Sequence, residues 1–331
     1  MDDAIIRSKA KSAILGAMVG DALGASVEFF TATDAREIIK EYNYFKDGLV
    51  GNGPFNMSPG QFTDDTEMGL AAMAVMVKHG KYDQAKVAEA YHQWYKSRPI
   101  SIGGTIKAAV SQPTLEKMLA VAGSANTKSI SNGSLMRLPI IIALHYNKTR
   151  FELITAVTQD VALTHGHPDL CAVAIVYASM LYEAIRGSSA SDVYEKGRQM
   201  ANLNEFNGIY CPLVSDLYRA VDNGENTITY NGRVWSIDNI DPQNMGFCGY
   251  AMWLLLLCLK NHTAYATAMI DIASRGNDSD SQCCIVGAVM AALYPVPKKW
   301  IDSVMKFSNQ NRFRTYPIAN PAVWTKWLTM A

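Results

Sequence analysis

Apolar residues recur along most of the chain with the period of an α-helix. Between residues 82 and 96, one apolar stripe at positions i, i+4, i+7 and i+8 is formed by Val87, Tyr91, Trp94 and Tyr95. Residues at this spacing lie on one face of a helix. The same pattern occurs in four further segments, so we predict an all-α fold. These segments are residues 151–163, 169–185, 246–259 and 264–273.

Strand-like alternation is confined to one short segment. There, Asn231-Gly232 stands between Tyr230 and Val234. Asn-Gly is the preferred sequence for a type I′ turn joining two strands. We therefore expect a small β-hairpin insertion near residues 227–235.

The chain carries no internal repeat, low-complexity tract or linker, so residues 1–331 are predicted to form a single domain. Pro297 before Lys298 predicts a late helix start, with proline in the first turn. The loops at 47–61 and 122–132 are rich in glycine and polar residues and lead into helical patterns. Such loops are expected to line a functional site.

Composition narrows the function classes. Apolar residues make up 49% of the chain and charged residues 18%, which is enough apolar material for a large core. The 30 basic residues balance the 30 acidic ones. A neutral chain lacks the positive field typical of general nucleic-acid or membrane binding. A nucleotide ligand must therefore be held by a local pocket.

The cysteines and the chain start give expectations about the compartment. None of the six cysteines forms a C-x-x-C pair, which favours reduced thiols without structural zinc. No secretory signal follows Met1, and the apolar run 250–259 is too short to span a bilayer. We expect a cytoplasmic monomer that does not use a membrane.

Two acidic clusters each precede an apolar helix. The first is Thr63-Asp64-Asp65, before residues 68–75, and the second is 277–281, before residues 283–293. Taken alone, each pattern is typical of a helix N-cap. Taken together, the four carboxylates would repel one another near a core unless cations compensated them. Ligand sets made only of oxygens favour Mg²⁺, with Mn²⁺ as a substitute.

Six motifs, from about Ala13 to Trp300, occur in the order found in one enzyme family. Read together, they resemble the ADP-ribosylglycohydrolase family, which includes dinitrogenase-reductase-activating glycohydrolases and hydrolases of ADP-ribosyl-arginine and ADP-ribosyl-serine. The motifs are Gly16 to Gly24 followed by Glu28, Phe62 to Thr66, Ile102 to Thr105, Ser131 to Arg137, Thr164 to Pro168, and Gly276 to Ser281.

This resemblance implies a compact orthogonal helical bundle with two Mg²⁺ ions at the base of a cleft. In such relatives the cations orient the ribose that carries the scissile bond. Glu28, Asp64 and Asp65 take the catalytic positions, with Glu28 suited to proton transfer or to closing the site. The metal ligands implied by the motifs are Thr63, Asp64, Asp65, Asp278, Asp280 and Ser281.

The remaining motif residues are expected to bind substrate. Glycine-rich turns present backbone N–H groups to phosphate without a Cβ in the way. The resemblance assigns Ser131, Asn132, Gly133 and Ser134 to the diphosphate or the distal ribose. It assigns Gly103, Gly104 and Thr105 to the leaving-group side, and His165 to the ribose–phosphate region.

Several motif residues also have structural interpretations. Gly16 and Gly20 recur at a spacing of four, which favours close helix packing. Asp21 could stiffen the site from behind. Arg137 could pair with a metal-site acid or bind phosphate. Phe247 and Tyr250 could stack on adenine, although aromatic residues near an apolar run are more often part of the core.

Two departures from the family pattern bear on the substrate. Asn277 replaces a glycine, and asparagine tolerates a left-handed backbone. Ser101 stands where several arginine-directed relatives carry an acid. The motif at Thr164 to Pro168, however, looks more like the arginine-directed branch.

The sequence therefore predicts a hydrolase that removes ADP-ribose from a modified protein, with arginine as the expected linkage, and so reverses mono-ADP-ribosylation. Three alternatives remain open. One is O-glycosidic cleavage at serine, in poly-ADP-ribose or on nucleic acid, which would then be a partner only as a modified substrate. The second is a non-catalytic, crystallin-like protein that binds ADP-ribose or has a structural role, and the third, more distant, is a two-metal phosphohydrolase.

Overall fold

The computed structural model describes residues 2–202 and 211–307, together with Trp324 and Leu328. Within these residues the chain forms sixteen α-helices and one two-stranded sheet, which confirms the all-α prediction. The α-helices are α1 (Asp3–Gly24), α2 (Ala32–Glu41), α3 (Tyr44–Asp47), α4 (Asp64–His79), α5 (Gln84–Lys96), α6 (Gly104–Val110), α7 (Leu115–Ala122), α8 (Leu138–Leu144), α9 (Arg150–Ala162), α10 (Pro168–Ile185), α11 (Ala190–Asn202), α12 (Pro212–Asn223), α13 (Cys248–Lys260), α14 (Tyr265–Ala273), α15 (Ser279–Leu293) and α16 (Lys298–Lys306). Two 3₁₀ turns, η1 (Asn132–Ser134) and η2 (Pro242–Asn244), complete the described elements.

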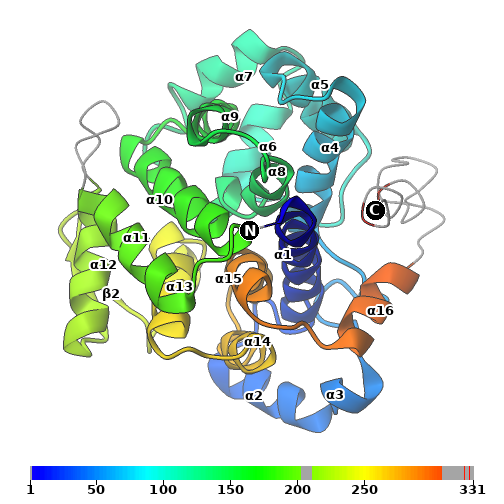
Figure 1. Cartoon of the computed structure of the whole chain (residues 1–331), viewed down its shortest axis with the longest axis vertical. Coiled ribbons are helices and arrows are strands. Elements are labelled where there is room, and N and C mark those ends of the chain that lie inside the picture. The colour runs from blue at the N-terminus through cyan, green and yellow to red at the C-terminus, as the bar shows by residue number, and fades with distance from the viewer. Residues whose placement is uncertain (1, 203–210, 308–323, 325–327, 329–331) are drawn as a thin grey trace.

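Helices α1 and α15 lie side by side at the centre of the molecule, and the other helices surround them (Figure 1). Glycines on α1 allow this close approach. A Cβ at Gly20 would lie 2.2 Å from the carbonyl oxygen of Cys283, and one at Gly24 would lie 2.3 Å from that of Ser279. At Gly16 it would lie 2.1 Å from the Cβ of Ala291. The packing role predicted for Gly16 and Gly20 is confirmed.

Helix α10 is the most apolar long helix of the described chain. It is long and apolar enough to cross a membrane on length and composition alone, but 78% of that window is buried inside the protein. Tyr177 on α10 donates a hydrogen bond to the carbonyl oxygen of Ile285 on α15, at 2.7 Å. The helix therefore has the environment of a core helix.

The predicted hairpin is present. Strands β1 (Thr227–Tyr230) and β2 (Arg233–Ser236) pair antiparallel. Asn231 and Gly232 both adopt positive φ, at 52° and 71°, as a type I′ turn requires. Trp235 of β2 stacks on Phe247, with 3.8 Å between ring centroids. The hairpin thus packs against the segment that leads into α13.

Two local expectations were wrong. The loop at 47–61 does not line the acidic cleft described below, because it packs against α16 instead. Leu49 N–H donates to Ser303 Oγ at 3.1 Å, and a Cβ at Gly60 would lie 2.2 Å from the carbonyl oxygen of Ser303. Pro297 is the N-cap of α16 rather than a residue of its first turn.

Candidate metal centre

Both acidic clusters lie at helix starts. Thr63 is the N-cap of α4, and Asp64 and Asp65 occupy its first turn. Asp278 is the N-cap of α15, and Asp280 lies in its first turn. The helix N-terminus favours negative charge, so each cluster is locally stable in this position. Local structure alone does not bring the two clusters together.

Asp21 of α1 supports the first cluster from behind, and Thr63 joins the first cluster to the second. It is fully buried and accepts hydrogen bonds from Thr63 N at 2.9 Å and from Thr66 N at 3.0 Å. The Thr63 hydroxyl lies 3.0 Å from Asp21 Oδ1, 3.1 Å from Asp65 Oδ2 and 3.4 Å from Asp280 Oδ2. Residues about 217 positions apart in the chain therefore meet at a single threonine oxygen.

Glu28 completes the cluster from the turn after α1. One carboxylate oxygen from each of Glu28, Asp278 and Asp280 lies within 4.8 Å of the other two. The turn is held by Asn277, whose carbonyl oxygen accepts from Phe29 N at 2.7 Å. Asn277 adopts the left-handed conformation predicted for it, with φ 57°.

Burial makes these carboxylates difficult to ionise together. Burial, and then the charges of Asp280 and Asp278, together raise the pKa of Glu28 to about 12. Burial also raises the pKa of Asp64 to about 7, although a hydrogen bond from Ser101 opposes the shift. The pKa values of Asp65 and Asp280 are raised well above their ordinary range for the same reason. Positive charge is needed to hold several of these groups ionised at neutral pH.

Within the described chain, the protein itself does not supply that charge. Glu28 Oε2 and Asp65 Oδ1 are buried without a hydrogen-bond partner. Arg275, the basic residue nearest to the second cluster in sequence, pairs with Asp271 instead. A set of carboxylate and hydroxyl oxygens with unsatisfied buried atoms fits a hard divalent cation such as Mg²⁺ or Mn²⁺.

The acids open into a cavity of about 240 Å³. Gly103 and Gly104 form part of its wall, and a Cβ added at either would meet nothing within 4 Å. Twelve residues assigned to the site from sequence line this acidic cleft. They are Glu28, Asp64, Asp65, Gly103, Gly104, Thr105, Ser131, Asn132, Gly133, Asp278, Asp280 and Ser281.

Three assigned residues lie behind the cleft wall. Thr63 is fully buried beneath the acids. Ser134 is fully buried, and its hydroxyl has no hydrogen-bond partner within the described residues. His165 is 2% exposed, with Nε2 2.9 Å from the Ser131 hydroxyl. Asn132 does line the cleft, but its side chain donates to Asp278 Oδ2 at 2.6 Å. Asn132 thus holds an acid in place.

Six further residues of the cleft wall were given no role in the site from the sequence: Phe29, Ile102, Ile106, Met136, Met245 and Gly246. Phe29 is 52% exposed and adopts φ 63°, a conformation that is unusual for a bulky side chain. No sequence signal marks that conformation. Phe29 and Met245 also line a neighbouring cavity of about 760 Å³, which includes Arg36 and Arg275.

A third cavity, of about 300 Å³, shares Ser131 and Gly246 with the acidic cleft. Trp235 and Phe247 lie on its wall. Phe247 is only 3% exposed, and its ring is already stacked on Trp235. Tyr250 is fully enclosed, at 1% exposed, and belongs to the core.

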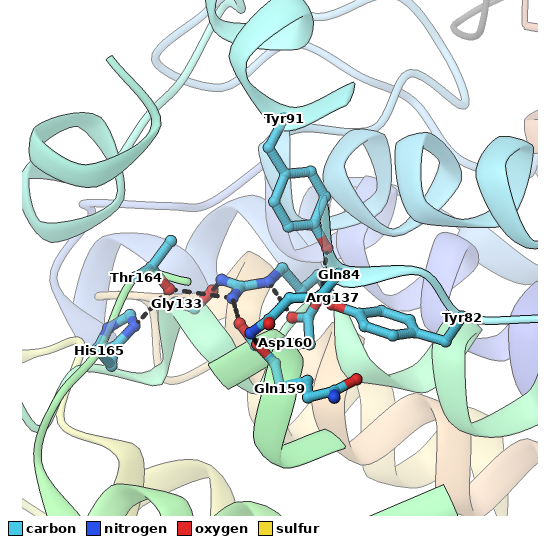
Figure 2. Close-up of polar contacts among 9 residues, drawn as sticks. All are labelled: Tyr82, Gln84, Tyr91, Gly133, Arg137, Gln159, Asp160, Thr164 and His165. Atoms are coloured by element: carbon cyan, nitrogen blue, oxygen red, sulfur yellow. Dashed lines mark hydrogen bonds and ion pairs between the residues drawn. The ribbon is translucent and has the colours of Figure 1, made fainter. Parts of the chain in front are cut away.

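Arg137 is a buried structural partner of an acid, as one of the two interpretations from the sequence had it, but that acid is Asp160 and not a metal-site acid. Its guanidinium is fully buried and pairs with Asp160 of α9, with 2.6 Å between Nε and Oδ1. Figure 2 shows this pair below Tyr91 and beside Tyr82, whose hydroxyls both donate to Asp160 Oδ2. Arg137 precedes α8 and extends into the core behind the turn at Gly133, away from the acids.

Comparison with known proteins identifies the family. The ADP-ribosylglycohydrolase family model matches residues 2–324. A protein of Acanthamoeba polyphaga mimivirus, provisionally named ADP-ribosyl glycohydrolase L543, is 43% identical over 98% of this chain and 99% of its own length. The ADP-ribosyl-[dinitrogen reductase] glycohydrolase of Rhodospirillum rubrum is 26% identical over 93% of this chain and 94% of its own. The ADP-ribosylarginine hydrolase Tri1 of Pseudomonas putida is 24% identical over 89% of this chain and 74% of its own.

A solved structure supports the same fold. A chain of an ADP-ribosylglycohydrolase-related protein complex superposes with a TM-score of 0.66 at 20% identity, covering 99% of this chain and 100% of its own. This likeness shows the helical architecture, and the family model adds the chemistry, hydrolysis of ADP-ribose linkages. The chain belongs to the ADP-ribosylglycohydrolase family of hydrolases.

Proposed function

We propose that this enzyme hydrolyses the N-glycosidic bond between ADP-ribose and an arginine side chain of a modified protein, with two Mg²⁺ ions as cofactors. The observation that carries the proposal is the meeting of the two acidic clusters at Thr63, with buried carboxylate oxygens that have no hydrogen-bond partner among the described residues. Buried acids of this kind are costly unless cations compensate them.

The residues suited to hold the cations are those that sequence assigned to them: Thr63, Asp64, Asp65, Asp278, Asp280 and Ser281. When bound, the cations would offset the clustered charge and polarise oxygens of the ligand. Mn²⁺ has the same preference for oxygen ligands and is the expected substitute. Asn132 and Asp21 hold Asp278 and Thr63 by hydrogen bonds, so the ligand set is largely preorganised.

The chain's own groups have distinct tasks in this reaction. Glu28 and Asp64 line the cleft and are suited to proton transfer with the attacking water or the leaving group. The open wall at Gly103 and Gly104 leaves room for the departing side chain. The third cavity, which shares Ser131 and Gly246 with the cleft, is suited to the distal part of ADP-ribose.

Arginine is the favoured linkage because of the motif at Thr164 to Pro168, and a relative named ADP-ribosylarginine hydrolase supports it. One observation favours an O-glycosidic substrate such as ADP-ribosyl-serine. Ser101 lines the cleft beside Asp64, so this position offers a hydroxyl where an acid would attract a guanidinium. The O-linked reaction is therefore the second candidate.

A panel of defined substrates tests the proposal. Purified enzyme is incubated with ADP-ribosyl-arginine, ADP-ribosyl-serine and ADP-ribosylated DNA, with Mg²⁺ or with chelator, and free ADP-ribose is measured. We expect the fastest release from arginine, only with Mg²⁺, and its loss in an Asp278→Asn variant. Fastest release from serine would support the second candidate. Binding of ADP-ribose without turnover of any substrate would contradict both.

A further inference from the structure

A chain of hydrogen bonds connects the buried Arg137–Asp160 pair to the cleft wall. Arg137 Nη2 donates to Thr164 Oγ1 at 3.0 Å, and Thr164 Oγ1 lies 2.8 Å from His165 Nδ1. His165 Nε2 lies in turn 2.9 Å from Ser131 Oγ. Figure 2 shows Thr164 and His165 extending this series beyond the guanidinium. Of these residues, only Ser131 lines the cleft.

The chemistry of the Arg137 guanidinium and the Thr164 hydroxyl decides which group donates and which accepts in this series of hydrogen bonds. A guanidinium can only donate, so the Thr164 oxygen accepts from Arg137. Thr164 is fully buried, and among the described residues His165 Nδ1 is the acceptor within reach of its hydroxyl hydrogen. A buried hydroxyl hydrogen without an acceptor is costly. Thr164 therefore donates to Nδ1, and the ring proton of neutral His165 is placed on Nε2.

The same reasoning extends to Ser131. With its proton on Nε2, His165 donates to Ser131 Oγ at 2.9 Å. Ser129 Oγ also donates to Ser131 Oγ, at 3.2 Å. Both lone pairs of the Ser131 oxygen are then occupied. Its own hydrogen is left to point into the cleft, where it can meet an acceptor.

The surroundings keep His165 neutral. Burial, and then the positive charge of Arg137, lower the pKa of His165 to about 3. Arg137 is itself fixed by Asp160 and by the carbonyl oxygen of Gly133, to which its Nη1 donates at 2.9 Å. The Arg137 guanidinium is therefore held in place at the start of this series of hydrogen bonds, and it stays charged near neutral pH.

We propose that Arg137 and Thr164 are positioning residues that fix the tautomer of His165 and thereby make Ser131 a hydrogen-bond donor to an anionic oxygen of the ligand in the acidic cleft. A phosphate oxygen, which only accepts, is the matching chemical class. The inference rests on the proposed function in one respect, because it takes the ligand to be ADP-ribose.

The test combines a spectrum with a binding measurement. Nitrogen–proton correlation spectra of histidine-labelled enzyme report the tautomer of His165, with its signal assigned by a His165→Gln variant. The affinity for ADP-ribose is then measured by calorimetry in the wild type, Thr164→Val, Thr164→Ser and Thr158→Val. Thr158→Val is the matched control, because it removes a hydroxyl from α9 that, among the described residues, bonds only to backbone carbonyl oxygens of that helix.

We expect the wild type to carry the proton on Nε2. Thr164→Val should mix the tautomers and weaken ADP-ribose binding about tenfold, the effect of losing one hydrogen bond to a charged group. Thr164→Ser should restore both readouts, and Thr158→Val should leave both unchanged.

The proposal is overturned if wild-type His165 carries its proton on Nδ1, a result that needs no variant to fold. It is also overturned if folded Thr164→Val binds ADP-ribose as tightly as the wild type. Failure of the proposed function looks different. In that case the wild type releases no ADP-ribose from any substrate, while the tautomer and the binding differences remain measurable.

Discussion

The molecule buries carboxylates in two places and treats them in opposite ways. Asp160 is fully buried, with Arg137 on one oxygen and the hydroxyls of Tyr82 and Tyr91 on the other, at 3.0 and 2.8 Å. In the acidic cleft, Glu28 and Asp65 are also buried, yet each has an oxygen without a hydrogen-bond partner in the part of the chain that the structure describes. The protein therefore supplies hydrogen-bond partners for both oxygens of Asp160, but not for all the oxygens of Glu28 and Asp65.

The difference separates a structural acid from a functional one. A buried charge that exists for stability is compensated within the fold, because a lone charge in the interior costs several kcal/mol. Acids left uncompensated mark a place where an external cation completes the structure. The comparison supports a metal centre more strongly than the acidic motifs do alone, since helix starts also favour acids for local reasons.

The largest expected effect comes from the cleft. Asp280→Asn removes one proposed ligand charge at nearly constant volume. We expect release of ADP-ribose to fall about a thousandfold or more, because cations at such sites supply several kcal/mol of charge stabilisation. Asp302→Asn, at an exposed pair on α16, is the matched control and should keep full activity. Near-normal turnover by Asp280→Asn would contradict the functional role that separates the cleft acids from the structural acid Asp160.

The same change at the structural acid should act on stability. Asp160→Asn leaves the Arg137 guanidinium buried without its counter-charge, so the free energy of unfolding should fall by about 3–5 kcal/mol. Asp222→Asn, at a half-exposed pair with Arg198, should cost about 1 kcal/mol or less. Urea unfolding followed by circular dichroism measures both. Equal losses in the two variants would show that burial of the pair is unimportant.

Metal removal and pH should affect the cleft together. Burial raises the pKa of Asp64 to about 7 and that of Asp21 to about 6, from an ordinary 3.8. In the protein without cations, protonation of these two carboxylates therefore stabilises the fold below pH 3.8. This contribution to the free energy of unfolding is lost as pH rises through 6 to 7. The rise in Tm on adding Mg²⁺ should accordingly grow over that window. A rise in Tm that does not depend on pH would argue against compensation of these acids by the cation.

The smallest expected effect comes from the tyrosine hydroxyls that donate to Asp160. Tyr82→Phe removes one of the two hydroxyls that donate to Asp160 Oδ2. We expect the free energy of unfolding to fall by about 1 kcal/mol, the net contribution of one hydrogen bond. Denaturant titration measures it, with Tyr91→Phe as the companion variant. No change in either variant would mean that Arg137 alone compensates the carboxylate.

Much of this molecule could be predicted from local patterns. Periodic apolar residues gave the helices, and Asn231-Gly232 gave the hairpin turn, because both signals arise within a few residues. The spacing of Gly16 and Gly20 predicted a close helix contact, although not which helix would provide it. The two acidic clusters were visible because a threonine or aspartate before an apolar helix is a local signal as well.

The partners of buried polar groups were decided by the tertiary structure. Arg137 could have faced the acids or a phosphate, and the packing of α8 against α9 gave it Asp160 instead. The orientation of His165 and the left-handed backbone of Phe29 likewise left no mark in the sequence. The physical reason is that a side chain's type fixes what it can bond to, whereas the group it meets depends on which distant helix packs beside it.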